Sequence, residues 1–144
     1  MSDLEKIRHW VSTYPRIDRV NGVKVDYLSH NPDNSSIDPS GVVEVSRKED
    51  ILGNVTVENQ YNFALYFVFS KDPGDDQGAT DNAEWLMDFQ RWVQEQSSRK
   101  NTPIFGDEPQ NESAKAQNGA LYAADEEGTA IYLVQLSFNF TKHF

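Results

Sequence analysis

The segment from Asp81 to Arg99 places the strongest constraint on what this chain can fold into. Its large apolar side chains recur at intervals of three and four residues, as on one face of an α-helix: Trp85, Phe89, Trp92 and Val93. Asp81 and Glu84 form an acidic variant of the capping box and mark the start of this helix. A helix with so much apolar surface is not stable alone in water, so it needs a sheet to lie on.

The sequence before this helix supplies its longest predicted strand. Residues 54–70 alternate between two faces, and one face carries a row of aromatic side chains that includes Phe67. Both faces of the second half are apolar, which indicates a central strand rather than an edge strand. Shorter strands are predicted at residues 23–28 and 43–45, where apolar and polar residues also alternate.

After the helix, the chain is predicted to end in a β-hairpin. Its strands are residues 119–124 and 130–141, joined by an acidic turn, and the second strand alternates apolar and polar residues along its whole length. The side chains that we expect to anchor the core come from the helix and the two long strands. They are Trp85, Phe89, Trp92, Phe67, Tyr132 and Phe138.

The remaining segments are predicted to be loops or a second helix. Residues 2–14 have a capping box and an apolar stripe, so they predict an opening helix. Residues 30–41 and 101–118 are rich in proline and polar residues, and we expect both to protrude as long loops. Residues 47–53 are either a turn or an exposed excursion, and residues 72–78 lead into the main helix, which Thr80 or Asp81 caps.

The resulting order of elements is α-β-β-β-α-β-β. Strands joined by hairpins and meanders pair mainly antiparallel, and the two helices are expected to cover one face of the sheet. The predicted class is therefore α+β, arranged as a two-layer sandwich. At 144 residues the chain is predicted to form a single domain spanning residues 1–144.

Composition excludes several kinds of function. The chain has no cysteine, so disulfides, thiolate zinc sites and a cysteine nucleophile are ruled out. A formal net charge of -10 without a visible basic patch argues against specific nucleic-acid binding. No apolar run is long enough to cross a bilayer, so we expect no membrane association.

Residues that carry chemistry are present but form no recognisable motif. His9, His30 and His143 do not have the spacing of a metal site, and we interpret them as solvated side chains. Asp72, Asp75 and Asp76 could offer oxygen ligands to Ca²⁺, but their spacing differs from that of a calcium-binding loop. A solvated turn is the better interpretation, and we expect no metal, no cofactor and no catalytic residue.

A family resemblance lies mainly in the second half of the chain. A helix ending in residues 92–96 is followed by a polar stretch with prolines, then by Gln117 and residues 119–122, and an acidic turn leads into residues 130–136. This arrangement resembles the small tail terminator proteins of long-tailed bacteriophages and prophages of Gram-positive bacteria. These proteins are often labelled minor capsid or minor tail proteins.

The first half of the chain is compatible with the same family. It has a short opening helix, a strand around residues 25–28, and an aromatic strand that ends at residues 67–70 just before the main helix. The resemblance covers most of the chain in the order and length of its segments. It is carried by core and turn patterns rather than by catalytic residues.

The resemblance implies a viral structural protein without enzymatic activity. Such a protein forms a six-membered ring on the finished tail tube, stops tube polymerisation and presents the surface to which the filled head attaches. The implied partners are further copies of the chain, the major tail tube protein and a head–tail connector or head-completion protein. The DNA would pass through as cargo. The implied location is the virion, at the head–tail joint, after synthesis in the cytoplasm of the bacterial host.

Physical reasoning adds two expectations to this implied ring. A cyclic ring needs a heterologous interface, in which one patch of a subunit meets a different patch of its neighbour. An acidic pore lets DNA slide without sticking, because like charges repel. As a hypothesis, four acidic residues face the pore: Asp75, Asp76, Glu126 and Glu127.

Three other functions stay open at this point. The first is a neighbouring connector, such as a head-completion or stopper protein. The second is a small soluble enzyme or ligand-binding domain, which a deep pocket with converging polar groups would support. The third is an intracellular adaptor unrelated to phages.

Overall fold

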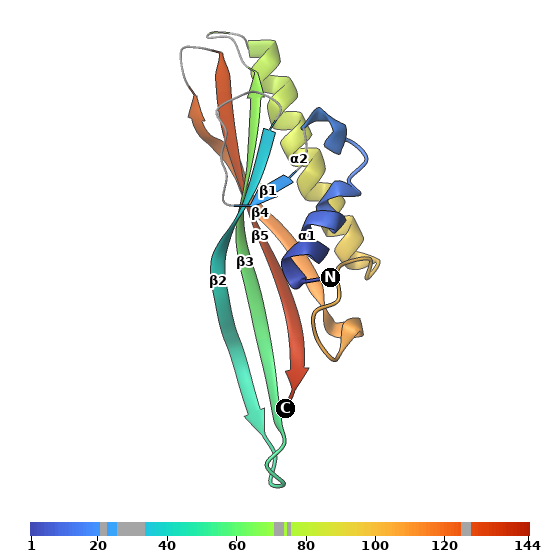
Figure 1. Ribbon diagram of the computed structural model, residues 1–144. Helices are drawn as coiled ribbons and strands as arrows, with labels where there is room; N and C mark the ends of the chain where they lie inside the picture. Colours follow the sequence, from blue (N-terminus) through green and yellow to red (C-terminus); the bar gives the residue numbers. More distant parts are fainter. Residues whose placement is uncertain (21–22, 26–33, 71–73, 75, 125–127) are drawn as a thin grey trace.

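The computed structural model describes residues 1–20, 23–25, 34–70, 74, 76–124 and 128–144 (Figure 1). Within these residues two α-helices, two short 3₁₀-helices and five strands follow in the predicted order, so the α+β class is confirmed. They are α1 (Asp3–Ser12), η1 (Ile17–Arg19), β1 (Val23–Val25), β2 (Asn34–Glu49), β3 (Val55–Ser70), α2 (Asp76–Ser98), η2 (Pro109–Asn111), β4 (Ser113–Ala124) and β5 (Thr129–His143).

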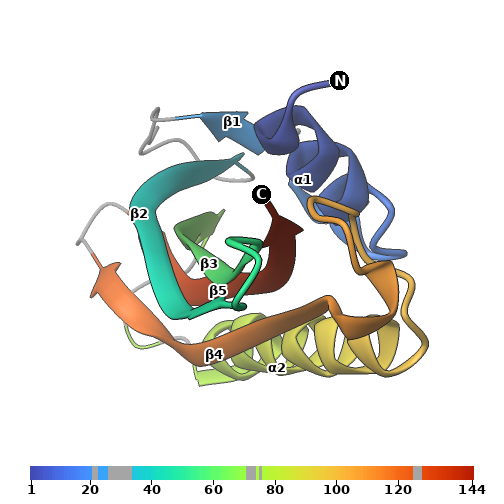
Figure 2. The ribbon, with the colours of Figure 1, turned by 90° about the horizontal axis from the view of Figure 1, so that it is seen from below.

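The described strands form one sheet in the order β1-β2-β3-β5-β4. The strand β3 is central, as predicted, because it pairs antiparallel with β2 on one side and with β5 on the other. The strand β4 adds to β5 antiparallel, and β1 pairs parallel with Ser35–Ile37 of β2. Viewed end-on, the sheet is strongly curved, with α2 beside β4 and α1 toward β1 (Figure 2).

The core lies where the two helices meet the aromatic side chains of β3 and β5. Phe67 lies opposite Tyr132 in the register of these strands, and both side chains are buried. Trp85 of α2 contacts Phe67 edge-on, with ring centroids 4.7 Å apart, and Trp10 of α1 contacts Phe138 in the same way at 5.5 Å. The aromatic stripe of α2 therefore meets the sheet side chains that alternate along β3 and β5.

Two phenol–carboxylate hydrogen bonds fasten α1 and the segment after it to the body. The Tyr61 hydroxyl of β3 donates to Asp3 at 2.6 Å, and the Tyr14 hydroxyl donates to Asp88 of α2 at 2.5 Å. Burial, followed by the hydrogen bond to the Asp3 carboxylate, raises the pKa of Tyr61 to about 12. Burial and the Asp88 carboxylate also raise the pKa of Tyr14. Both bonds therefore depend on neutral phenols.

The prediction of a loop at residues 30–41 is wrong for those of its residues that the structure describes. Residues 34–41 belong to β2, and residues 30–33 lie outside the described part. A bulge between Pro39 and Gly41 lets the strand keep its pairing with β3. Proline is tolerated there because, among the described strands, β1 covers only the beginning of β2. Beyond it, β2 runs on to Glu49, so residues 47–53 are the end of a strand followed by a turn.

The start predicted for the main helix is also wrong. The helix α2 begins at Asp76, so Thr80 and Asp81 lie inside it rather than at its cap. The Thr80 hydroxyl donates to the Asp76 carbonyl at 2.9 Å, as hydroxyls inside helices often do. Acidic residues near a helix N-terminus are favoured by the helix dipole, which explains why the extra turn forms in a polar sequence.

The prediction of a second loop at residues 101–118 is wrong in two respects, the length of the loop and its protrusion from the body. Residues 113–118 belong to β4, because this polar segment pairs with β5 despite its lack of large apolar side chains. The shorter segment 101–112 does not protrude, since Phe105 is buried in the core.

Removing the largest side chain of the α2 stripe should test the core directly. The fully buried Trp85 contacts both Phe67 and Phe69, so Trp85→Ala should lower the free energy of unfolding by roughly 3–5 kcal/mol. Met87 on the same helix is exposed, so Met87→Ala should change it by less than about 0.5 kcal/mol. Urea unfolding of both variants gives the comparison. Equal effects would contradict the assigned core face.

Alkaline pH should weaken the attachment of α1. A phenol whose pKa is raised in the folded state stabilises the fold fully below about pH 10, its unfolded value, and loses this contribution as the pH rises through about 12. In a pH titration followed by phenolate absorbance, the wild type should therefore show one more ionising tyrosine than Tyr61→Phe, and this tyrosine should ionise near pH 12. A difference that titrates near pH 10, as for an exposed tyrosine, would refute the hydrogen bond to Asp3.

Candidate functional site

The hairpin of β2 and β3 is the most prominent surface feature of the molecule. It extends far beyond both helices, with its turn at the end remote from the start of α2 (Figure 1). Residues 39–54 are all exposed, and they include Val42, Val43 and Val45. The exposed aliphatic side chains of this arm have no apolar cover among the described residues, so the arm is a candidate for contact with another molecule.

The turn at the end of this arm is tightly braced. The Asp50 carboxylate accepts hydrogen bonds from the backbone N–H groups of Leu52 and Asn54 at 2.9 and 3.0 Å, and from the Asn54 side-chain amide at 2.9 Å. These bonds, led by the one from the Asn54 side chain, lower the pKa of Asp50. Gly53 has a φ of 84°, which favours glycine.

The braced turn displays two large aliphatic side chains to solvent. Ile51 is 102% exposed and Leu52 is 83% exposed. Turns normally carry glycine, proline, asparagine, aspartate or serine at such positions, so the two aliphatic residues run against turn chemistry. We call Ile51 and Leu52 the hairpin tip.

The edges of the sheet are less suited to contact than the tip. The strand β2 has bulges between Pro39 and Gly41 and between Glu44 and Ser46, and β4 has two further irregularities in its register. Bulges, proline and charges on an edge strand oppose pairing with a further strand. On β4, the Ser97 hydroxyl of α2 also accepts the Ala114 N–H at 3.0 Å. These features favour contact through the side chains of the arm rather than through its backbone.

A pocket lined in part by Trp10 lies between α1 and the segment after α2. Its volume is about 530 Å³, and we call it the Trp10 pocket. Its lining combines apolar side chains with the bases Lys6 and His9: Met1, Lys6, His9, Trp10, Thr13, Asn101, Thr102, Pro103 and Ile104. Met1 and Ile104 are exposed, whereas Trp10 is buried.

Side-chain hydrogen bonds hold the far wall of the Trp10 pocket in place. The Trp10 indole N–H donates to the Asn101 carbonyl at 2.9 Å, and the Lys6 ammonium donates to the Ile104 carbonyl at 2.9 Å. Because both donors come from α1, they tie residues 101–104 to that helix. The pocket is thus a built feature of the fold rather than a gap between loops.

A buried carboxylate braces the same wall from behind. Glu112 is 2% exposed, and its two oxygens accept the backbone N–H groups of Phe105 and Gly106 at 2.8 and 3.1 Å. A side chain at Gly106 would overlap the carbonyl oxygen of Thr141 in β5, so this close approach requires glycine. Together these contacts fix the segment that forms the pocket wall.

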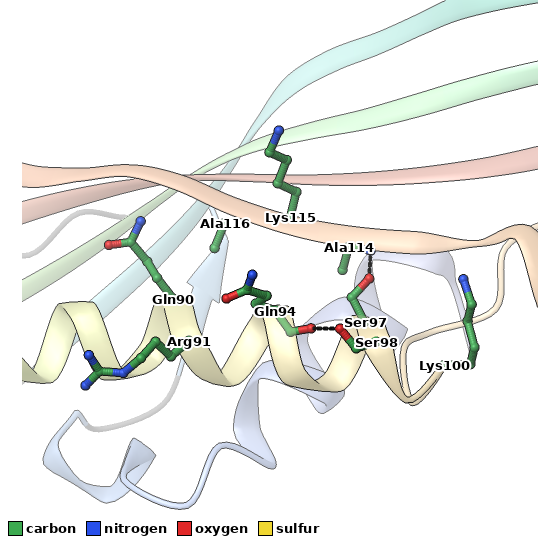
Figure 3. A pocket seen from close by; sticks show the side chains of 9 residues that line it. All are labelled: Gln90, Arg91, Gln94, Ser97, Ser98, Lys100, Ala114, Lys115 and Ala116. Atoms are coloured by element: carbon green, nitrogen blue, oxygen red, sulfur yellow. Dashed lines mark hydrogen bonds between the residues drawn. The ribbon is translucent and has the colours of Figure 1, made fainter.

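A second cavity, of about 580 Å³, lies between α2 and β4 (Figure 3). Gln90 and Gln94 point toward the strand, whereas Arg91 and Lys115 point away from the cavity. The Ser98 hydroxyl donates to the Gln94 carbonyl at 2.9 Å, so it is engaged within the helix. Among the described residues, no carboxylate or histidine lines this cavity, and the polar groups that do line it do not converge as a catalytic site requires.

The residues predicted as lumen-facing are only partly described. Asp76 is exposed at the first position of α2. Asp75, Glu126 and Glu127 lie outside the described residues, as do His30 and Asp72. Within the described part of the chain, no group of three or more histidine, aspartate or glutamate side chains could hold a metal ion.

The predicted core anchors all lie in or against the hydrophobic core. Trp85, Phe89, Phe67, Tyr132 and Phe138 are buried, and Trp92 is partly buried against them. Sequence reasoning missed the hairpin tip, the Trp10 pocket and Glu112. The tip left a signal, since two aliphatic residues stand between Asp50 and Gly53, in what the sequence indicates to be a turn.

Comparisons with known proteins add no assignment. No protein family matches the chain in a comparison with family models, and no curated protein matches it in a sequence search. Among the described residues, no helix is both long enough and apolar enough to cross a membrane. The arm and the pocket are therefore the features from which a function can be inferred.

Removing the buried carboxylate should loosen the pocket wall. Glu112→Ala leaves two N–H groups without their acceptor, so it should lower the free energy of unfolding by about 2–3 kcal/mol. It should also speed hydrogen exchange at Phe105 and Gly106. Glu95→Ala removes only an exposed ion pair with Arg99 and should cost less than about 1 kcal/mol. Unchanged hydrogen exchange at Phe105 and Gly106 in Glu112→Ala would contradict the role of Glu112 in bracing the pocket wall.

Proposed function

We propose that this protein is a structural subunit that forms a ring at the end of a bacteriophage tail tube, where it ends tube polymerisation and joins the tail to the head. The observation that carries the proposal is the projecting β2–β3 arm, with Ile51 and Leu52 exposed at its tip. An arm that contacts a different surface of a neighbouring copy makes a heterologous interface, which a ring requires.

The order of elements supports the same proposal. The opening helix, the aromatic strand β3, the helix α2 and the closing β4–β5 hairpin follow in the sequence that the tail terminator resemblance implies. The two-layer arrangement is part of this proposal. Trp10 and Trp85 contact Phe138 and Phe67, which share one face of the sheet by register, and these contacts favour two helices on one side.

The proposed ring binds other structural proteins and performs no catalysis. Its partners are copies of the chain, six in number as the resemblance implies, together with the tail tube protein and a head-completion protein. DNA passes through its opening, and a net charge of -10 opposes adhesion of DNA to its wall. Asp76 is the described residue proposed to face the opening.

Deleting the gene tests this role. The deletion is made in the genome that encodes the protein, particle production is induced, and the lysate is examined by negative-stain electron microscopy. We expect tails of uncontrolled length that are separate from DNA-filled heads, because nothing stops the tube or offers a docking surface. Re-expression of the wild-type chain from a plasmid should restore normal tails and serves as the control.

Two other outcomes of the same experiment would reject the terminator role. Tails of normal length beside leaking or tailless heads would move the protein to the head side of the joint, as a connector. Intact infectious particles would reject a structural role in the virion altogether.

A further inference from the structure

The hairpin tip has the properties of an anchor that is buried in another molecule. Two aliphatic side chains are held in full contact with water by a turn that Asp50 braces with three hydrogen bonds. This conformation is fixed before any partner arrives, so binding requires little further ordering of the turn. A preorganised apolar tip fits an apolar pocket of matching size.

A membrane is a poor candidate for the partner that receives the hairpin tip. The chain just before the tip carries Glu44, Arg47, Lys48, Glu49 and Asp50, so it has no excess of basic residues. Lipid surfaces in cells are anionic and attract basic segments instead. The mixed charges favour a protein surface that offers apolar contact.

The chain itself carries two apolar hollows that could receive the tip. The smaller one, of about 240 Å³, lies at the base of the same hairpin and includes the acidic Asp3 in its lining. The Trp10 pocket, of about 530 Å³, is larger, and its described lining includes Lys6 and His9. An apolar cavity of about 150 Å³ already admits a benzene-sized group, so the Trp10 pocket has room for two aliphatic side chains.

Size decides between the two hollows. The Asp3 carboxylate lines the smaller hollow, but it also pairs with Lys6 of the Trp10 pocket at 3.7 Å, so charge does not separate the two. The larger volume of the Trp10 pocket favours it as the site for two aliphatic side chains.

We propose that the hairpin tip, Ile51 and Leu52, inserts into the Trp10 pocket of a second copy of this chain. The inference deepens the proposed ring, on which it rests, by naming its subunit contact. Tip and pocket are different surfaces, so each copy can give its tip to one neighbour and receive the tip of another. If the rotation between copies closes, the same contact repeats around a ring.

Engineered cysteines test the contact, since the chain has no cysteine of its own. One preparation carries Leu52→Cys, and the other carries Thr102→Cys, which leaves the apolar walls of the pocket intact. The two are mixed at high concentration and oxidised. Because a disulfide requires Cα atoms within about 7 Å, a 52–102 dimer should form only if the tip enters the pocket.

Two controls make the result specific. Mixing Leu52→Cys with Tyr122→Cys, an exposed position on β4, should give only background dimer. Adding Ile51→Asp to the Leu52→Cys chain should lower the 52–102 yield about tenfold or more, the factor expected for losing one buried aliphatic side chain. Circular dichroism and urea unfolding should show that this exposed substitution leaves the fold unchanged.

The possible failures separate the two proposals. A 52–102 yield no higher than the 52–122 background, or a 52–52 yield from Leu52→Cys alone that exceeds the 52–102 yield, overturns tip insertion. If electron microscopy of the wild type still shows rings in that case, the ring proposal stands and uses another interface. If it shows no rings on tube ends or in solution, the ring proposal fails as well.

Discussion

The packing of the α2 aromatic stripe against β3 and β5 is the interaction on which the rest of the structure depends. Trp85 and Phe89 are fully buried against Phe67, and α1 adds Trp10 to the same core. This core covers only part of the long strands. The hairpin of β2 and β3 continues past the helices, with β5 paired to β3 along most of it (Figure 1). The Trp10 pocket is lined by α1 and residues 101–104.

Sequence patterns predicted the features that depend on periodic burial. The α2 stripe and the alternation in β3 and β5 predicted the element order, since buried faces repeat at 3.6 or 2 residues. The patterns failed where pairing, rather than burial, forms the strand. Residues 34–41 and 113–118 are polar, yet they pair with β3 and β5. The Trp10 pocket and the role of Glu112 depend on contacts between distant segments, which no local pattern records.

The energetics of the proposed contact favour a closed ring over a pair. Burying two aliphatic side chains contributes roughly 3–6 kcal/mol, whereas association costs at least about 4 kcal/mol in lost freedom. One tip in one pocket is therefore a weak bond. In a closed ring each copy is held by two such contacts at once, so the assembly is far more stable than any single contact. Weak pairing with cooperative closure suits a cap that forms on a template.

The most direct test of this account is the mass of the purified protein measured by light scattering as a function of concentration. The comparison is between the wild type and a variant with Ile51→Ser and Leu52→Asn, which removes the aliphatic tip and puts residues common in turns in its place. The account predicts that the wild type rises above the 16.4 kDa of one chain, whereas the variant stays at that mass. Identical curves for the two proteins would contradict it.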